Sequence, residues 1–225
     1  MSGQHNTGAT YALSLSGSTS ITAGTGVTLE SLNDNTGTIA LLSSGGIDGG
    51  SGTVLMRAAN YAFGGADRTI TTTGVLTIEP DADENSFASS FDNQYLNPVS
   101  VTGLTLGKSS NASAITLSRA ISLSGPVSIY GGSIDVNANI TANSGNILLD
   151  ADTGSTLNQS STGILLDDAI TIETVTSGNL TLIGRSGDTG SGFDGIDASS
   201  ANTTTLRSAG NLTLQGYSYA ASGSG

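Results

Sequence analysis

A short phrase returns along this chain: a small residue, a glycine, often an asparagine or proline, and then alternating apolar and polar residues. Four clear copies occupy residues 124–129, 144–149, 177–182 and 209–214, and looser copies occupy 36–39, 51–56, 73–78 and 102–106. A glycine turn followed by a short strand, repeated about every 20 residues, is typical of a solenoid of stacked β-coils. The sequence therefore predicts an all-β fold with parallel sheets along one axis.

Composition supports this prediction. The chain has 32 glycines, four phenylalanines, no cysteine and no tryptophan in 225 residues, so it lacks the large side chains that fill a thick globular core. A β-solenoid needs only a narrow file of Val, Ile, Leu and Ala along its axis. No window shows helical periodicity. We expect one solenoid domain over residues 1–225, with roughly ten coils if each takes about 20 residues.

The expected strands alternate between inward apolar and outward polar side chains. Leu180 and Leu182, for example, flank Thr181, and successive side chains of a strand point to opposite faces. Asparagines 146, 179 and 211 each follow a turn glycine. If the coils stack in register, these asparagines form a hydrogen-bonded ladder along one corner.

Residues 79–98 interrupt this sequence repeat, which continues after them. The segment contains Pro80 and Pro98 and holds Phe87, Phe91 and Tyr95 at intervals of four residues. We expect an insertion loop, and two hypotheses remain open for it. It is either a ligand-binding element carried by a rigid scaffold, or a short helical turn that covers apolar coil surface.

Charge limits the partners of the chain. The chain has six Lys and Arg but 18 Asp and Glu, which gives a net charge of −12. This charge disfavours binding to nucleic acids and to anionic membrane surfaces. No apolar stretch is long enough to span a membrane. Residues 1–6 lack the features of a signal peptide, and neither end of the chain supplies a convincing polar cap. We therefore expect an excerpt of a longer exported protein rather than an intracellular one.

Two acidic loops are candidate calcium sites, because hard cations take oxygen ligands from flexible loops. The first holds Asp81, Asp83 and Glu84, and the second, rich in glycine, holds Asp188, Asp194 and Asp197. Neither matches a known calcium motif, so plain acidic loops are the alternative. No other cofactor is expected.

A catalytic role is also conceivable for paired carboxylates that follow two strands. They are Asp150, Asp152, Asp167 and Asp168, and stacked coils can bring such acids together in polysaccharide-cleaving enzymes. Such enzymes usually also need basic or aromatic groups to hold the sugar, and no Lys, Arg, His or aromatic residue lies near these carboxylates in the sequence. We interpret them as solvated turn residues and predict that the chain is not an enzyme.

The chain resembles a known family most clearly in residues 103–108, 115–117, 121–123 and 125–140. This run is similar to the repeat region of giant bacterial adhesins of the filamentous-haemagglutinin type, and residues 74–80 resemble the piece that precedes it. The resemblance extends over residues 70–185. It implies a right-handed parallel β-helix in a secreted or surface-anchored protein used for attachment, biofilm formation or cell contact. The secretion-recognition motifs of that family are not found here.

Two classes of function follow. The first is an adhesive scaffold, extracellular or on the bacterial cell surface, which binds a host or neighbouring-cell surface or glycan through residues 79–98. The second is a filament subunit that associates with itself end to end. A polysaccharide-cleaving enzyme is a distant third.

Overall fold

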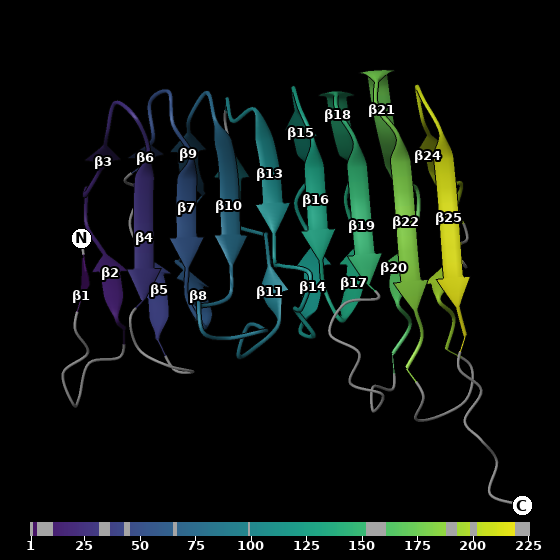
Figure 1. The fold of residues 1–225 in the computed structure, drawn as a ribbon, viewed down its shortest axis with the longest axis horizontal. Helices are drawn as coiled ribbons and strands as arrows, with labels where there is room; N and C mark the ends of the chain where they lie inside the picture. Colours follow the sequence, from purple (N-terminus) through teal and green to yellow (C-terminus); the bar gives the residue numbers. More distant parts are fainter. Residues whose placement is uncertain are drawn as a thin grey trace, which may run out of the picture.

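The computed structural model describes residues 2–3, 11–31, 37–42, 46–64, 67–98, 100–151, 161–187, 193–198 and 202–218. In these residues every strand pairing is parallel and there is no helix. The described part of the chain therefore has no helix that could span a membrane. The strands build a coil with three sides, one strand on each, and the coils stack along one axis (Figure 1). The predicted parallel β-solenoid is confirmed.

One side of the solenoid is a single sheet that runs the whole length of the described stack. Its nine strands, in spatial order, are β1 (Ser2–Gly3), β4 (Val27–Ser31), β7 (Val54–Arg57), β10 (Val75–Glu79), β13 (Gly103–Leu106), β16 (Val127–Tyr130), β19 (Ile147–Ala151), β22 (Leu180–Arg185) and β25 (Leu212–Tyr217). Each strand is bonded to the next in parallel register, so this sheet holds all the coils together.

Each of the other two sides is divided into two sheets. The second side has β2 (Leu13–Leu15), β5 (Thr38–Leu41) and β8 (Asn60–Phe63), and then β11 (Phe91–Asp92), β14 (Ala114–Leu117), β17 (Ser133–Val136), β20 (Ile164–Leu166) and β23 (Ile196–Asp197). The third side has β3 (Ile21–Thr22), β6 (Ile47–Asp48), β9 (Arg68–Thr71) and β12 (Leu96–Pro98), and then β15 (Ile121–Leu123), β18 (Ile140–Ser144), β21 (Thr171–Ser177) and β24 (Thr205–Arg207).

Both breaks involve the same coil, which runs from β10 through β11 to β12. Strand β11 pairs forward with β14, whereas β12 pairs backward with β9. The coil therefore belongs to an N-terminal block of sheets on one side and to a C-terminal block on the other. Residues 91–98, the last part of the expected insertion loop, thus supply two paired strands of the stack.

Coil length varies more than the sequence phrase indicates. Val127 pairs with Ile147, 20 residues later, but Ile147 pairs with Leu180, 33 residues later. The extra residues lie between β19 and β22, because these two strands pair residue for residue. Longer coils explain why the continuous sheet has nine strands, slightly fewer than the roughly ten coils expected.

The core is one apolar file, as the alternation predicted. On the continuous sheet, Leu104, Val127, Ile147 and Leu180 pair in succession and are almost completely buried. The intervening side chains, such as Thr181, point outward and are half-buried. The outer surface of this sheet is therefore largely polar.

The asparagine ladder predicted at one corner is present. The side-chain oxygen Oδ1 of Asn146 accepts the backbone N–H of Asn179 at 2.9 Å, and Oδ1 of Asn179 accepts the N–H of Asn211 at 2.8 Å. Asn146 and Asn179 thus each satisfy a turn amide in the following coil, which fixes the register of the three coils.

We expect Asn179→Ala to lower the free energy of unfolding by about 1 kcal/mol, because the N–H of Asn211 loses its acceptor. Asn179→Asp keeps a side-chain oxygen at the same place and should cost clearly less. Urea unfolding followed by circular dichroism measures both values. Equal losses in the two variants would contradict a ladder that works through this oxygen.

Candidate functional site

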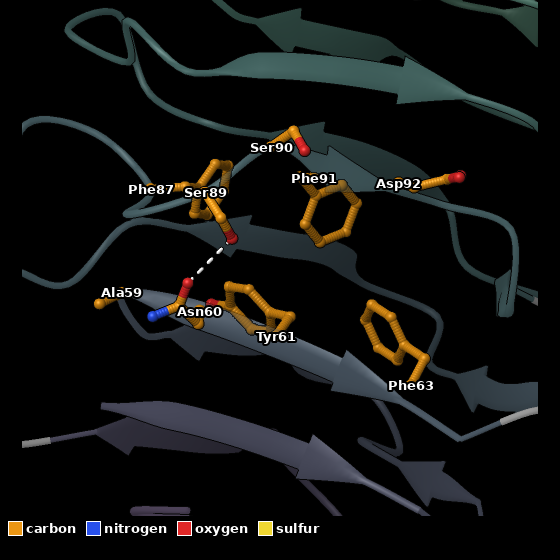
Figure 2. A pocket seen from close by; sticks show the side chains of 9 residues that line it. All are labelled: Ala59, Asn60, Tyr61, Phe63, Phe87, Ser89, Ser90, Phe91 and Asp92. Atoms are coloured by element: carbon orange, nitrogen blue, oxygen red, sulfur yellow. Dashed lines mark hydrogen bonds between the residues drawn. The ribbon is translucent and has the colours of Figure 1, made fainter. Parts of the chain in front are cut away.

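Four aromatic side chains fill the break between β8 and β11. Tyr61 and Phe63 come from β8, and Phe87 and Phe91 come from the next coil (Figure 2). Tyr61 meets Phe91 edge to face with ring centroids 5.7 Å apart, and Phe87 stacks on Phe91 at 5.5 Å. Such contacts stabilise aromatic pairs beyond simple burial. The rings replace the missing strand pairing with packing.

The loop that carries Phe87 is bonded to the coil that follows. Asn111, which is completely buried, accepts the N–H of Phe87 through Oδ1 at 3.2 Å, and its Nδ2 donates to the carbonyl oxygen of Tyr130 at 2.8 Å. The hydroxyl of Ser113 donates to the carbonyl oxygen of Phe87. A single buried amide thus joins three coils and holds the loop against the stack.

The three aromatic residues predicted to bind a ligand have different environments. Phe87 and Phe91 are only 4% and 3% exposed, so their rings face protein rather than solvent. Tyr95 is half-buried and lies outside the cluster, and its carbonyl oxygen accepts the N–H of Arg68 at 2.8 Å. The spacing of four residues does not reflect a helical turn, because residues 87–95 contain no helix.

A small hollow of about 30 Å³ lies beside these rings. Its lining is Ala59, Asn60, Tyr61, Phe63, Phe87, Ser89, Ser90, Phe91 and Asp92. The Ser89 hydroxyl donates to Oδ1 of Asn60 at 2.9 Å and closes its rim, as the dashed line in Figure 2 shows. A hollow of this size holds about one water molecule. The arrangement is suited to joining the two blocks rather than to enclosing a ligand.

The break on the third side is bridged by polar contacts. The two terminal guanidinium nitrogens of Arg119, Nη1 and Nη2, donate to the two carboxylate oxygens of Asp67, at 2.5 and 2.9 Å. Asn93, which is buried, accepts the N–H of Arg119 and donates to its carbonyl oxygen, both at 2.9 Å. A bidentate pair and a doubly bonded amide fix geometry well, so the two blocks are joined on this side too.

The electrostatics of the aromatic cluster keep Tyr61 neutral. Its hydroxyl donates to the carbonyl oxygen of Glu79 at 2.8 Å, and burial, together with the nearby Glu79 charge, raises the pKa of Tyr61 well above its ordinary value. Arg57 binds the Glu79 carboxylate at 2.5 Å. Tyr61 is therefore a structural hydrogen-bond donor, and burial outweighs the backbone contacts with Ala58 and Glu79 that favour the phenolate a nucleophile or base would need.

The structure does not bring the first set of expected calcium ligands together. Asp81 is buried, and its Oδ1 accepts the N–H of Ala82, whereas Asp83 is exposed and Glu84 is half-buried. Within the described ranges, no three His, Cys, Asp or Glu side chains are grouped so that they could hold a metal ion.

The second expected calcium loop is only partly described. Asp188 lies outside the described residues, Asp194 is exposed and Asp197 is half-buried in β23. The carbonyl oxygen of Asp194 accepts the N–H of Gly163 at 3.0 Å, so its backbone has a structural role.

The carboxylates considered for catalysis lie on different sides of the solenoid. Asp150 is in β19 of the continuous sheet, whereas Asp167 and Asp168 follow β20 on the second side; Asp152 lies outside the described residues. Burial raises the pKa of Asp150, and the charge of Arg185 partly opposes this. Asp168 accepts a hydrogen bond from the side chain of Asn202 at 3.1 Å. The described carboxylates do not form an acid–base pair.

Asp135 in β17 is another carboxylate whose surroundings oppose its charge. Burial raises its pKa, and the charges of Asp167 and Asp92 add to this, while a hydrogen bond from Asn137 opposes it. Its Oδ1 is buried with no hydrogen-bond partner. The folded protein therefore binds a proton at Asp135 more tightly than the unfolded chain does.

This difference predicts a pH effect. The contribution of Asp135 to stability should increase as the pH falls through its raised folded pKa, and it should level off below the ordinary unfolded value. We expect Asp135→Asn to raise the melting temperature at neutral pH and to remove this component. The hydrogen bond from Arg119 lowers the pKa of Asp67, so Asp67 contributes stability that is lost as the pH falls. We therefore expect Asp67→Asn to lower the melting temperature at neutral pH and to remove that component. Melting temperatures from pH 4 to 7 test both; equal pH slopes in Asp135→Asn and the parent would refute the first.

Sequence reasoning missed Tyr61 and Phe63 as partners of Phe87 and Phe91. Residues 60–63 place two rings on alternate positions of a strand, and this pattern, rare in a chain with so few aromatics, was the available signal. This pattern indicates that two rings lie on the same face of a strand, but it does not show which residues of a neighbouring coil they pack against.

Comparison with known proteins adds no relative: no family model, curated protein or solved structure matches this chain.

Proposed function

We propose that this chain is a non-enzymatic scaffold of an extracellular or surface-attached bacterial adhesin, of the filamentous-haemagglutinin type that the sequence resembles. The observation that carries the proposal is the continuous nine-stranded parallel sheet. A stack of coils bonded from end to end is a rigid spacer, and solenoids offer long side surfaces for binding.

The surface and charge of the chain fit this role. The outward positions of the continuous sheet are mostly polar, and the net charge of −12 keeps such a rod soluble and away from anionic surfaces. The partners that suit it are a protein or glycan on a host or neighbouring cell.

Attachment of coated beads tests the proposal. Beads that carry the folded chain should adhere to cultured epithelial cells or to neighbouring bacteria, and beads that carry the heat-unfolded chain should not. The folded chain should release no sugar from polysaccharides. Equal adhesion of both kinds of bead, or polysaccharide cleavage, would refute the proposal.

A matched pair of variants tests residues 79–98 as the binding element. Tyr95 is the accessible member of the aromatic set, since Phe87 and Phe91 are buried. If the segment binds the partner, Tyr95→Ala should weaken bead adhesion while Tyr130→Ala, at another half-buried tyrosine on the continuous sheet, leaves it unchanged. Equal adhesion of both variants would place the binding element elsewhere.

One observation favours a filament subunit as a second candidate. Leu212 and Leu214 in β25 are 48% and 51% exposed, although they pair in register with the fully buried Leu180 and Leu182. A second copy stacked on this strand would cover the apolar residues and extend the sheet. Electron microscopy of the purified chain should then show fibres of constant width. Monodisperse rods would rule this candidate out.

A further inference from the structure

The third side of the N-terminal block carries a regular three-residue pattern. Ile21 in β3 pairs with Ile47 in β6, which pairs with Ile70 in β9. The residues on either side of these isoleucines point outward and form two columns across the strands. One column is Ser20, Gly46 and Thr69, and the other is Thr22, Asp48 and Thr71.

Gly46 leaves a gap in the first column. A hollow of about 150 Å³ opens beside it, lined by residues of both columns and, between them, by Ile21 and Ile47, whose side chains pack toward the core. A Cβ atom added at Gly46 would lie 3.3 Å from the carbonyl oxygen of Thr69, so a larger side chain there would occupy the hollow.

The chemistry of this groove differs from that of the aromatic cluster. Its described lining offers the hydroxyls of Ser20, Thr22, Thr69 and Thr71 and the carboxylate of Asp48, with no cation and no aromatic ring. The N–H of Gly50 donates to Oδ1 of Asp48 at 2.9 Å. This bond fixes the carboxylate, and its other oxygen can accept hydrogen bonds from a ligand.

We propose that this groove binds one neutral hexopyranose unit of a glycan. Threonine methyl groups provide apolar contact for the C–H groups of the ring, and the strand hydroxyls bond its hydroxyls. Asp48 can accept hydrogen bonds from two adjacent hydroxyls, which strengthens them because the acceptor is charged. The same carboxylate and the net charge of −12 disfavour uronic and sialic acids. The inference rests on the proposed adhesive function and names its ligand class.

Titration of the isotope-labelled chain, followed by amide chemical shifts, tests the groove. The probes are methyl glycosides of galactose, mannose and glucose, with glucuronate as the anionic comparison. At least one neutral glycoside should shift the amides of residues 20–22, 46–48 and 69–71 saturably, with a dissociation constant on the order of 1 mM, and glucuronate should not. No saturable shift, shifts elsewhere only, or an equal response to glucuronate would overturn the proposal.

Two variants with matched controls identify the contacts. Gly46→Val should abolish the shifts by filling the hollow, whereas Gly24→Val, at a glycine with open space around it, should not. Asp48→Asn keeps the acceptor for Gly50 and should weaken binding about tenfold. Its control is Asp92→Asn, since Asp92 makes the same turn with the N–H of Gln94 at 2.9 Å. If Gly46→Val does not fold, the Asp48 pair decides; unchanged affinity in Asp48→Asn would overturn the assignment.

Bead adhesion separates this inference from the proposed function. Beads that adhere without any saturable sugar shift in the groove would refute the groove and leave the adhesive scaffold standing. Loss of adhesion in Asp48→Asn and retention in Asp92→Asn would support both. Beads that do not adhere, with a groove that still binds the glycoside, would refute the scaffold's adhesive role but not the groove.

Discussion

Leu180→Asp is expected to remove most of the stability of the fold, whereas Thr181→Asp, one position along the same strand, should change it little. Leu180 is completely buried between Ile147 and Leu212 in the apolar file. A carboxylate there has no partner, and an unpaired buried charge costs several kcal/mol. That penalty is comparable with the whole stability of many domains, about 5–15 kcal/mol.

Thermal unfolding followed by circular dichroism measures the difference. Thr181 points outward, so its replacement by Asp should shift the midpoint by a few degrees at most, while Leu180→Asp should fail to fold or melt far below the parent. Ile147→Asp and Ile172→Asp, at two other fully buried positions, should behave like Leu180→Asp. Equal midpoints for the two changes at 180 and 181 would contradict the assignment of inward and outward positions.

The fold could be predicted because its strands are set by local patterns. In the clear copies, a glycine marks the corner and alternation marks the inward face, as in residues 177–182. Parallel stacking then follows, because equivalent positions of successive coils must share one apolar file. The asparagine ladder was predictable for the same reason: each rung repeats at the same place in the coil.

The role of residues 79–98 could not be predicted, because it depends on contacts between coils. The partners of Phe87 are Asn111, about one coil later, and Tyr61, about one coil earlier. No local pattern shows that β11 pairs forward while β12 pairs backward. A loop with two prolines and no clear alternation resembles an insertion until those long-range bonds are known.

The groove at Gly46 escaped sequence reasoning for a different reason. Its residues are ordinary outward Ser, Thr and Asp, and only the register of three separate strands shows that a glycine lies between Ser20 and Thr69. A glycine shows where a column of side chains has a gap only once its neighbours on the adjacent strands are known.

Gly178→Ala is expected to destabilise the protein by about 3–5 kcal/mol, because this position combines a backbone and a packing restriction. Its φ angle is +112°, which residues with a Cβ rarely adopt. A Cβ atom at this position would also lie 1.9 Å from the carbonyl oxygen of Gly145 in the preceding coil. The backbones of two coils approach so closely at this corner that only glycine fits.

Gly17→Ala separates the two effects. Gly17 also has a positive φ, +69°, but nothing lies within 4 Å of a Cβ placed there. This variant should therefore cost only about 1–2 kcal/mol, from the backbone conformation alone. Urea unfolding of both variants gives the comparison. The glycine of the repeated phrase lies at this corner in successive coils. A large excess cost at Gly178 would show that glycine is required there by close stacking of backbones together with a φ of +112°, beyond the left-handed region that Gly17 occupies. Equal costs would show that an ordinary left-handed turn conformation is sufficient.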